Sequence, residues 1–161
     1  MVHRIFQGNG FADVSKQLQQ LKDVSGRLET ENLTGKFVGS IPDASLPYFA
    51  PEAQAAQDAV EEVVQRNLRL VLGAQFTEKE GERLISRSYN RKLSGAENKK
   101  RVDRLTTQIE TAARAKQEAA DYFEEHGTLK GFKGKLWTMA DFLKDRNSGS
   151  QTPKVVSNSS S

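Results

Sequence analysis

The chain has 161 residues, of which 36% are hydrophobic and 28% are charged, and its net charge is +3. An ordinary globular domain carries roughly 45–50% apolar residues when glycine is counted with them, so this length and composition predict one domain with a thin core. Cysteine is absent, which excludes disulfides and thiolate chemistry. No apolar run approaches the roughly 20 residues of a membrane-spanning helix, and the N-terminus lacks the apolar stretch of a signal peptide. We therefore expect a soluble protein that is made in the cytosol.

The N-terminal third is expected to contain an arm, one helix and an irregular crossover. Residues 1–12 hold two glycines and a few apolar residues, and we expect an irregular arm there. Over residues 13–31 apolar side chains recur at alternating intervals of four and three, the pattern of an amphipathic helix that packs on a core. Residues 32–51 contain two glycines and three prolines, so no long regular element is expected there. The aromatic residues of this crossover favour packing on its own domain, with docking to a partner as the alternative.

A helix, its end and the start of a second helix are encoded within residues 52–81. Gly73 stands where a left-handed C-terminal cap is expected. Thr77 and Glu80 have the spacing of a capping box, in which the Thr77 hydroxyl accepts from the Glu80 amide and the Glu80 carboxylate reaches back to the Thr77 amide. A short helix over residues 78–88 is expected to follow. The first helix carries one apolar stripe at helical spacing, made of Val60, Val63, Val64, Asn67, Leu68 and Val71.

The longest helix is expected from Gly95 to about Glu125. Ser94 and Glu97 form a second capping box at its start, and Gly127 supplies the glycine at its end. Alanines make up part of its seam, and small side chains let another helix approach closely. The seam residues recur at intervals of three and four, and they are Val102, Leu105, Ile109, Ala112, Lys116, Ala119 and Phe123.

The C-terminal part predicts one more short helix and a tail. The helix is expected from about Leu136 to Arg146. Apolar residues occupy most of its circumference, which indicates burial on both sides or contact with a partner. Residues 147–161 are polar and low in complexity, so we expect a disordered tail. The candidate partner contact consists of Leu136, Trp137, Met139, Phe142 and Leu143.

The sequence shows no constellation of catalytic or metal-binding residues. His3 lies in the arm, and His126 lies at a helix C-terminus, where the helix dipole favours a cation and a structural role is expected. HExxH spacing, the GxGxxG fingerprint and the Walker loop are absent. The acidic pair 61–62 points to different sides of its helix, and Glu78 and Glu82 lie at a solvated helix start beside basic residues. No enzymatic activity, cofactor or metal site is therefore expected.

Basic residues concentrate between positions 83 and 104, where eight Lys and Arg accompany two acidic residues, a net charge of +6. Arg83 and Arg87 align at helical spacing, as do Lys100 and Arg104. Such a surface can contact phosphates or an acidic partner. A solvated face that keeps the protein soluble is the alternative. The candidate residues are Arg83, Arg87, Arg91, Lys92, Lys100 and Arg104.

Several stretches resemble a segment of tailed-bacteriophage proteins. The similar words are GAQFTEKEGE at 73–82, AEN at 96–98, and Tyr122-Phe123 leading to the GTL of 127–129. The likeness extends over roughly residues 32–134 and includes no catalytic signature. The family consists of virion structural proteins or internal DNA-ejection proteins encoded near the portal and tail genes. The resemblance thus implies a particle component in the head–tail or DNA-ejection apparatus.

Together these patterns predict an elongated all-α protein of four or five helices, with its helical domain over residues 13–146, that works by contact. A thin helical subunit completes its burial against copies or partners. The resemblance implies that the partners are other virion proteins and copies of the chain itself, with DNA as a further partner, and that the protein resides in the virion after synthesis in the host cytoplasm. A small nucleic-acid-binding regulator is the alternative function, and an enzyme such as a small lysin ranks last.

Overall fold

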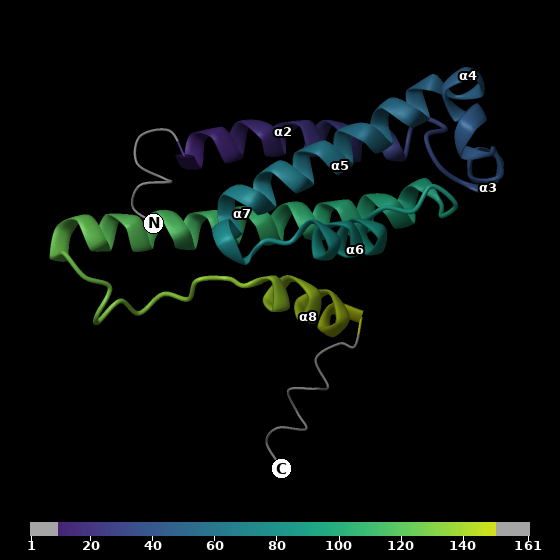
Figure 1. Cartoon of the computed structure of the whole chain (residues 1–161). Helices are drawn as coiled ribbons and strands as arrows, with labels where there is room; N and C mark the ends of the chain where they lie inside the picture. The colour runs from purple at the N-terminus through teal and green to yellow at the C-terminus, as the bar shows by residue number, and fades with distance from the viewer. Residues whose placement is uncertain (1–9, 151–161) are drawn as a thin grey trace, which may run out of the picture.

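The computed structural model describes residues 10–150, with side chains placed up to residue 144. All regular structure in this range is helical, which confirms the all-α prediction (Figure 1). Within the same range no helix is both long and apolar enough to span a membrane. In chain order the elements are α2 (Gly10–Leu28), α3 (Lys36–Gly39), the 3-10 turn η1 (Asp43–Ser45), α4 (Leu46–Phe49), α5 (Pro51–Leu72), the 3-10 turn η2 (Gly73–Gln75), α6 (Glu78–Ser88), α7 (Gly95–His126) and α8 (Met139–Ser150).

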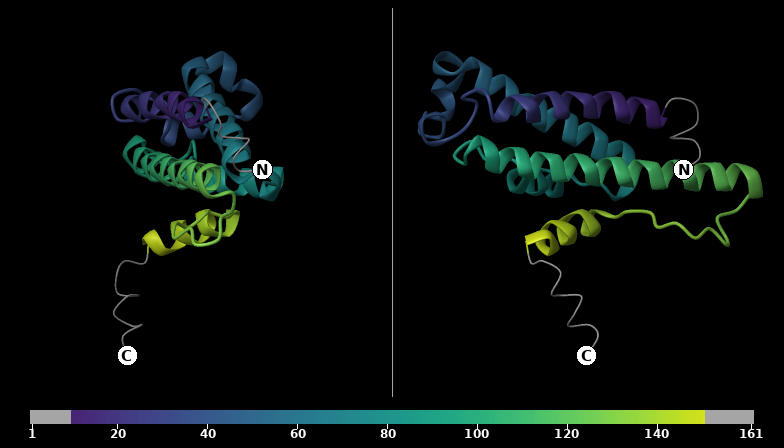
Figure 2. Two further views of the ribbon diagram at one scale, coloured as in Figure 1. Left: turned by 90° about the vertical axis from the view of Figure 1, so that its left-hand side faces the viewer. Right: turned by 180° about the vertical axis from the view of Figure 1, so that it is seen from behind.

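The long helix α7 is the axis of an elongated molecule. Helices α2 and α5 lie along one side of α7, and the extended segment 127–138 returns along the other side to α8 (Figures 1 and 2). The start of α2 meets the middle of α7, where the Arg114 guanidinium lies over the Phe11 ring at 5.4 Å from its centroid. The end of α2 meets the start of α7 at Leu28 and Gly95. Helices α2 and α7 are therefore antiparallel.

One main core joins the helices along this axis. Every residue of the predicted α5 stripe is buried, and so are the α7 seam positions from Val102 to Ala119, whereas Phe123 is exposed. Burial of each large apolar side chain stabilises a fold by about 1.5–3 kcal/mol, so these stripes supply the main driving force for association of the helices. The largest fully buried side chains of the core include Leu18, Leu21, Leu68, Leu84, Leu105, Ile109 and Phe142.

Helix α2 begins and ends three residues earlier than its apolar pattern predicts. Residues 10–12 of the predicted arm already belong to the helix, and residues 1–9 lie outside the described part. The helix ends at Leu28 because the start of α7 packs against it. A Cβ at Gly95 would lie 1.9 Å from the Leu28 carbonyl oxygen, so only glycine permits this approach.

Each of the two predicted capping boxes forms one of its two predicted hydrogen bonds. The Thr77 hydroxyl accepts from the Glu80 amide at 3.3 Å, and the Ser94 hydroxyl accepts from the Glu97 amide at 3.1 Å. The return bonds differ from the prediction. The Glu80 carboxylate accepts from the Thr77 hydroxyl at 3.2 Å, and Glu97 instead pairs with Arg101 at 2.8 Å. The first half alone fixes where α6 and α7 begin, as predicted.

Helix α8 begins at Met139 and not near Leu136, because a further capping box precedes it. The Asp141 amide donates to the Thr138 hydroxyl at 3.2 Å, and the Asp141 carboxylate accepts from the Thr138 amide at 2.8 Å. The helix then continues through Ser150, so residues 147–150 of the predicted tail are helical. Once a helix has formed its first turn, each further residue adds a hydrogen bond at little cost. Residues 151–161 lie outside the described part.

Helices α5 and α7 both end at a glycine, but the predicted left-handed cap forms only at Gly127, and the prediction for Gly73 is wrong. Gly127 adopts the left-handed conformation after α7, with φ 76° and ψ 1°. Gly73 has a positive φ of 60° but a ψ of −129°, which is not the left-handed helical conformation. The buried Lys116 ammonium donates to the carbonyls of Leu70 and Val71 at 3.1 and 2.9 Å. A seam position of α7 thus satisfies carbonyls that the end of α5 leaves without helical partners.

The crossover 32–51 is ordered and packs on its own domain. Val38, Ile41 and Leu46 are buried with Ala53 in a second, smaller core cluster. These four residues link the crossover to the first turn of α5. The prediction that the crossover packs internally is confirmed for its buried side chains, while its aromatic residues behave differently and are described below.

Candidate interaction surfaces

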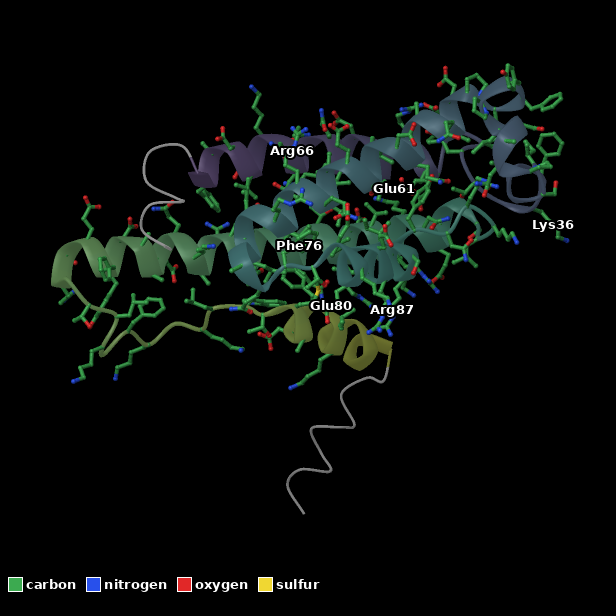
Figure 3. All side chains as sticks on the ribbon, in the orientation of Figure 1. Lys36, Glu61, Arg66, Phe76, Glu80 and Arg87 are labelled. Carbon is green, nitrogen blue, oxygen red and sulfur yellow. The ribbon has the colours of Figure 1, made fainter. Side chains whose placement is uncertain are left out.

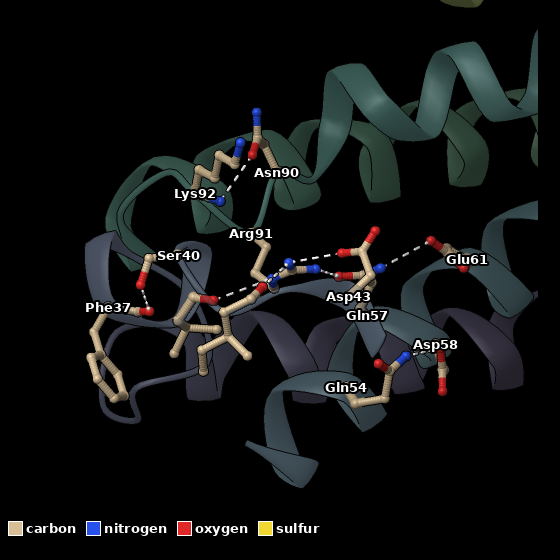
Figure 4. Close-up of polar contacts among 12 residues, drawn as sticks. Phe37, Ser40, Asp43, Gln54, Gln57, Asp58, Glu61, Asn90, Arg91 and Lys92 are labelled. Carbon is tan, nitrogen blue, oxygen red and sulfur yellow. Dashed lines mark hydrogen bonds and ion pairs between the residues drawn. The ribbon is translucent and has the colours of Figure 1, made fainter. Parts of the chain in front are cut away.

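The guanidinium of Arg91 holds the crossover against the bundle. It donates to the Ile41 carbonyl and the Asp43 carboxylate, both at 2.9 Å, and to the Val38 carbonyl and the Gln57 side chain, both at 3.4 Å (Figure 4). The Arg91 side chain is only 13% exposed. An arginine can make such a fan of bonds because its five N–H donors have a fixed planar geometry.

The turn that carries Arg91 is itself fixed by a buried amide. Asn98, in the first turn of α7, accepts from the Asn90 amide at 2.8 Å and donates to the carbonyls of Asn90, Leu93 and Ser94. The Arg91 carbonyl accepts in turn from the Gly35 amide at 2.8 Å. A continuous set of hydrogen bonds therefore leads from α7 through the 90–94 turn to the crossover.

The crossover presents three aromatic side chains to solvent at one end of the molecule. Phe37 is 76% exposed, Tyr48 is 84% exposed and Phe49 is 74% exposed. They lie on α3 and α4, whose inward side chains Val38 and Leu46 share the small core cluster. Figure 1 shows α3 and α4 together at one end, which Lys36 marks in Figure 3. We call these three residues the aromatic end.

The aromatic end lies on a backbone that is held in place and not on a mobile loop. The backbone beneath it is held by the Arg91 bonds, by the small core cluster and by a hydrogen bond from the Ser40 hydroxyl to the Phe37 carbonyl at 2.7 Å. Among the described residues, one other large apolar side chain counts as exposed, Phe123, at only 37%. Exposed apolar surface that is concentrated in one place is typical of interaction sites.

The predicted basic surface is only partly available. Arg83, Lys92 and Lys100 are exposed, whereas Arg87 and Arg104 are half-buried. Arg91 is committed to the internal bonds described above, so its assignment to a free surface is corrected. The two predicted pairs do lie on neighbouring helices, because Arg83 and Arg87 belong to α6 and Lys100 and Arg104 to α7. Between them, Arg101 donates to the Arg87 carbonyl at 3.2 Å.

The residues predicted to contact a partner near the C-terminus largely serve the chain's own core. Met139 and Phe142 are buried in the main core, and Leu143 packs against it. The Trp137 ring lies 5.0 Å from the Phe142 ring, centroid to centroid. Leu136 and Trp137 line a cavity of about 70 Å³ beside Lys116. In this fold Met139 and Phe142 have almost no surface left for a partner, whereas Leu136, Trp137 and Leu143 are half-buried, so contact of these three with a partner stays a prediction.

An acidic groove that the sequence did not reveal runs between α5 and α6, with a volume of about 910 Å³. Asp58 and Glu61 line one wall, and Glu78 and Glu82 line the other. Burial, and then the negative charge of Asp58, raises the pKa of Glu61 above its usual value, and Glu82 contributes from the opposite wall. Acidic side chains outnumber basic ones in the lining, which also includes Arg69, Arg91 and Lys92. Sequence spacing paired Glu78 with Glu82 along one helix, but it could not place Glu61 opposite them.

Tyr89 lies at the inner end of this groove and is almost fully buried. Burial raises the pKa of its phenol to about 12. Its hydroxyl has no hydrogen-bond partner among the described groups.

One of the two histidines, His126, lies within the part of the chain that the structure describes. His126 is exposed at the end of α7, where its ring stacks on Tyr122 at a centroid distance of 4.0 Å and Nδ1 lies 3.0 Å from the Tyr122 carbonyl oxygen. His3 lies outside the described residues. Between residues 10 and 144 no group of three or more His, Asp or Glu side chains is arranged to hold a metal ion.

Comparison with family models, with curated proteins and with solved structures finds no match to this chain.

Proposed function

We propose that this protein is a non-enzymatic structural subunit of a tailed-bacteriophage particle, acting by protein–protein contact in the head–tail or DNA-ejection apparatus. The observation that carries the contact role is the aromatic end. Three exposed aromatic rings on a backbone held by Arg91 form a surface that is ordered before any partner binds. Such preorganisation lowers the entropic cost of association. The particle context comes from the resemblance of residues 32–134 to phage proteins.

The thin core supports the same proposal. Helix α7 extends beyond the other long helices, and among the described segments only the extended stretch 127–138 accompanies its last turns (Figure 2). An elongated helical chain exposes more surface for its volume than a compact domain does, so copies or partners add burial that the chain alone lacks. Aromatic residues are enriched at the centres of such interfaces.

The test is quantitative mass spectrometry of purified particles of the phage that encodes this chain, with infected-cell cytosol as the control. The proposal predicts a fixed copy number in the particle. A count near 12, near 6 or in the hundreds, on the order expected for a portal ring, a tail ring or a capsid lattice with closed symmetry, identifies the component. Absence from particles, with presence in the cytosol, contradicts the proposal.

The alternative, a small nucleic-acid-binding protein, is favoured by the exposed Arg83, Lys92 and Lys100. It predicts DNA affinity that falls steeply with salt concentration, because each neutralised phosphate releases counterions. Charge reversal at Arg83 and Lys100 reduces that affinity and the salt dependence. Particle incorporation without measurable DNA affinity excludes this alternative.

A further inference from the structure

We propose that the aromatic end is the interface between two copies of this chain, which pair end to end about a two-fold axis. The inference deepens the proposed function, on which it rests, by naming the partner that covers Phe37, Tyr48 and Phe49. The partner is identified by three properties of the patch: its area, its lack of charge and its position.

The area of the patch is close to what a specific pair requires. A fully buried aromatic side chain covers about 150–250 Å². Three rings that are 74–84% exposed therefore offer on the order of 450 Å² per copy. Two copies bury roughly 900 Å² through these rings, and a specific interface needs roughly 1,000 Å² in total. The exposed Ala44 and Pro47 lie between or beside the rings in sequence and supply apolar surface for the remainder.

The chemistry of the patch is compatible with its own copy. A two-fold interface brings the same patch together twice, so a charged centre would meet a like charge and be repelled. The three rings carry no charge, and aromatic pairs attract one another in offset or edge-to-face arrangements. In sequence the nearest charged residues are Lys36, Asp43 and Glu52, which lie beside the rings and not between those of α4; Asp43 and Glu52 are paired with Arg91 and Arg27.

The position of the patch favours a closed pair. The aromatic end lies at one end of the elongated bundle, so two bundles can meet there and extend in opposite directions without overlap (Figures 1 and 2). Among the described residues, the one other exposed large apolar side chain is Phe123 of α7, which is only 37% exposed. A single self-complementary patch closes with two copies and does not propagate into a filament.

The experiment is sedimentation velocity of the full chain over about 1–500 μM, a range in which an interface of this small area is expected to dissociate. The expected result is a monomer–dimer equilibrium. Tyr48→Ser and Phe49→Ser each raise the dissociation constant by at least about tenfold, because aromatic side chains at an interface centre carry most of its energy. Circular dichroism checks that each variant remains folded. We expect both variants to fold, because Tyr48 and Phe49 are exposed in the wild-type fold.

The matched control is Phe123→Ser, which removes a partly exposed aromatic ring near the other end of α7 and is expected to leave the dissociation constant unchanged. The inference is overturned by a monomer at all concentrations, by a dimer that is indifferent to Tyr48→Ser and Phe49→Ser, or by assembly beyond two copies.

The same variants separate this inference from the proposed function. A chain that is monomeric alone, yet needs Phe49 to enter particles, binds a different particle protein through the aromatic end; this overturns the inference and leaves the proposed function standing. A dimer that depends on Phe49 in a chain absent from particles supports the inference and contradicts the proposed function.

Discussion

The Arg91 guanidinium lies 2.9 Å from the Asp43 carboxylate, although 48 positions separate the two residues in the chain. This pair, with the bond from Arg91 to the Ile41 carbonyl, connects the 90–94 turn to the crossover. Because Asp43 is itself exposed, the ion pair alone contributes little to stability. The carbonyls that Arg91 satisfies matter more, since a buried acceptor left without a donor costs about 1–3 kcal/mol.

Arg91→Met is therefore expected to lower the free energy of local opening of the crossover by about 1–3 kcal/mol, while the main core remains folded. Hydrogen–deuterium exchange is the measurement, and residues 35–49 should exchange faster while α2 and α7 keep their protection. Arg83→Met, which removes an exposed arginine of α6, is the control and should change neither region. Unchanged exchange of residues 35–49 in Arg91→Met would show that the crossover is held by other contacts.

Two glycines provide a matched pair that tests the approach of α7 to α2. Gly95→Ala places a Cβ 1.9 Å from the Leu28 carbonyl oxygen, so the backbones must separate. We expect a loss of about 1–3 kcal/mol in the free energy of unfolding, the usual cost of overpacking. Gly26→Ala meets nothing within 4 Å and lies inside α2, so it should stabilise by about 0.5–1 kcal/mol. Urea unfolding followed by circular dichroism measures both, and equal effects would contradict the packing described for Gly95.

Lys116→Met removes the donor from the Leu70 and Val71 carbonyls and should destabilise by about 1–2 kcal/mol at pH 7. Burial lowers the pKa of Lys116 below its ordinary value of 10.5. The unfolded chain therefore binds more protons than the fold in the interval below 10.5, and wild-type stability gains with rising pH there. Lys116→Met lacks this gain. The difference in the free energy of unfolding between wild type and Lys116→Met therefore widens as the pH rises. Lys100→Met, at an exposed position of α7, should match wild type.

Asp141 makes the start of α8 sensitive to acid. Burial disfavours its charged form, but the hydrogen bonds from Thr138 and Lys135 outweigh burial and hold the pKa of Asp141 below its usual value. A carboxyl group whose pKa is lower in the folded chain stabilises the fold at pH values above the ordinary carboxyl pKa. This stabilisation is lost as the pH falls through the pKa of the folded state.

The measurement is urea unfolding followed by the fluorescence of Trp137, the sole tryptophan, in wild type and Asp141→Asn. The variant should be less stable than wild type by about 0.5–1 kcal/mol at pH 7 and nearly equal to it at about pH 2–3. Thr138→Ala should lose a similar amount of stability at both pH values through the missing cap. A deficit of Asp141→Asn that persists at low pH would contradict the assigned role.

The helices were predictable because their signals are local. Thr77, Ser94 and Gly127 fix ends through side chains or conformations within a few residues, and the α5 stripe shows its own buried face. The start of α8 was missed although Thr138 and Asp141 have the spacing of a capping box, with Asp in place of the more familiar Glu.

The surfaces were less predictable because they depend on contacts between distant residues. Local charge placed Arg91 on a basic face, and only its contact with the crossover shows that it is internal. Composition showed that the crossover is apolar, but not that Val38 and Leu46 turn inward while Phe37 and Phe49 turn outward. The apposition of Glu61 and Glu82 likewise requires α5 and α6 to be packed side by side.

The central claim, that contact made by the aromatic end is required for this chain to enter a phage particle, is tested most directly by particle incorporation of the double variant Tyr48→Ser/Phe49→Ser. Copy number per particle is measured by mass spectrometry after complementation of a phage that lacks the chain, with Phe123→Ser as the control. The account predicts wild-type copy number for the control and at least about a tenfold loss for the double variant, as expected when two central aromatic contacts are removed. Wild-type copy number in a folded double variant would contradict it.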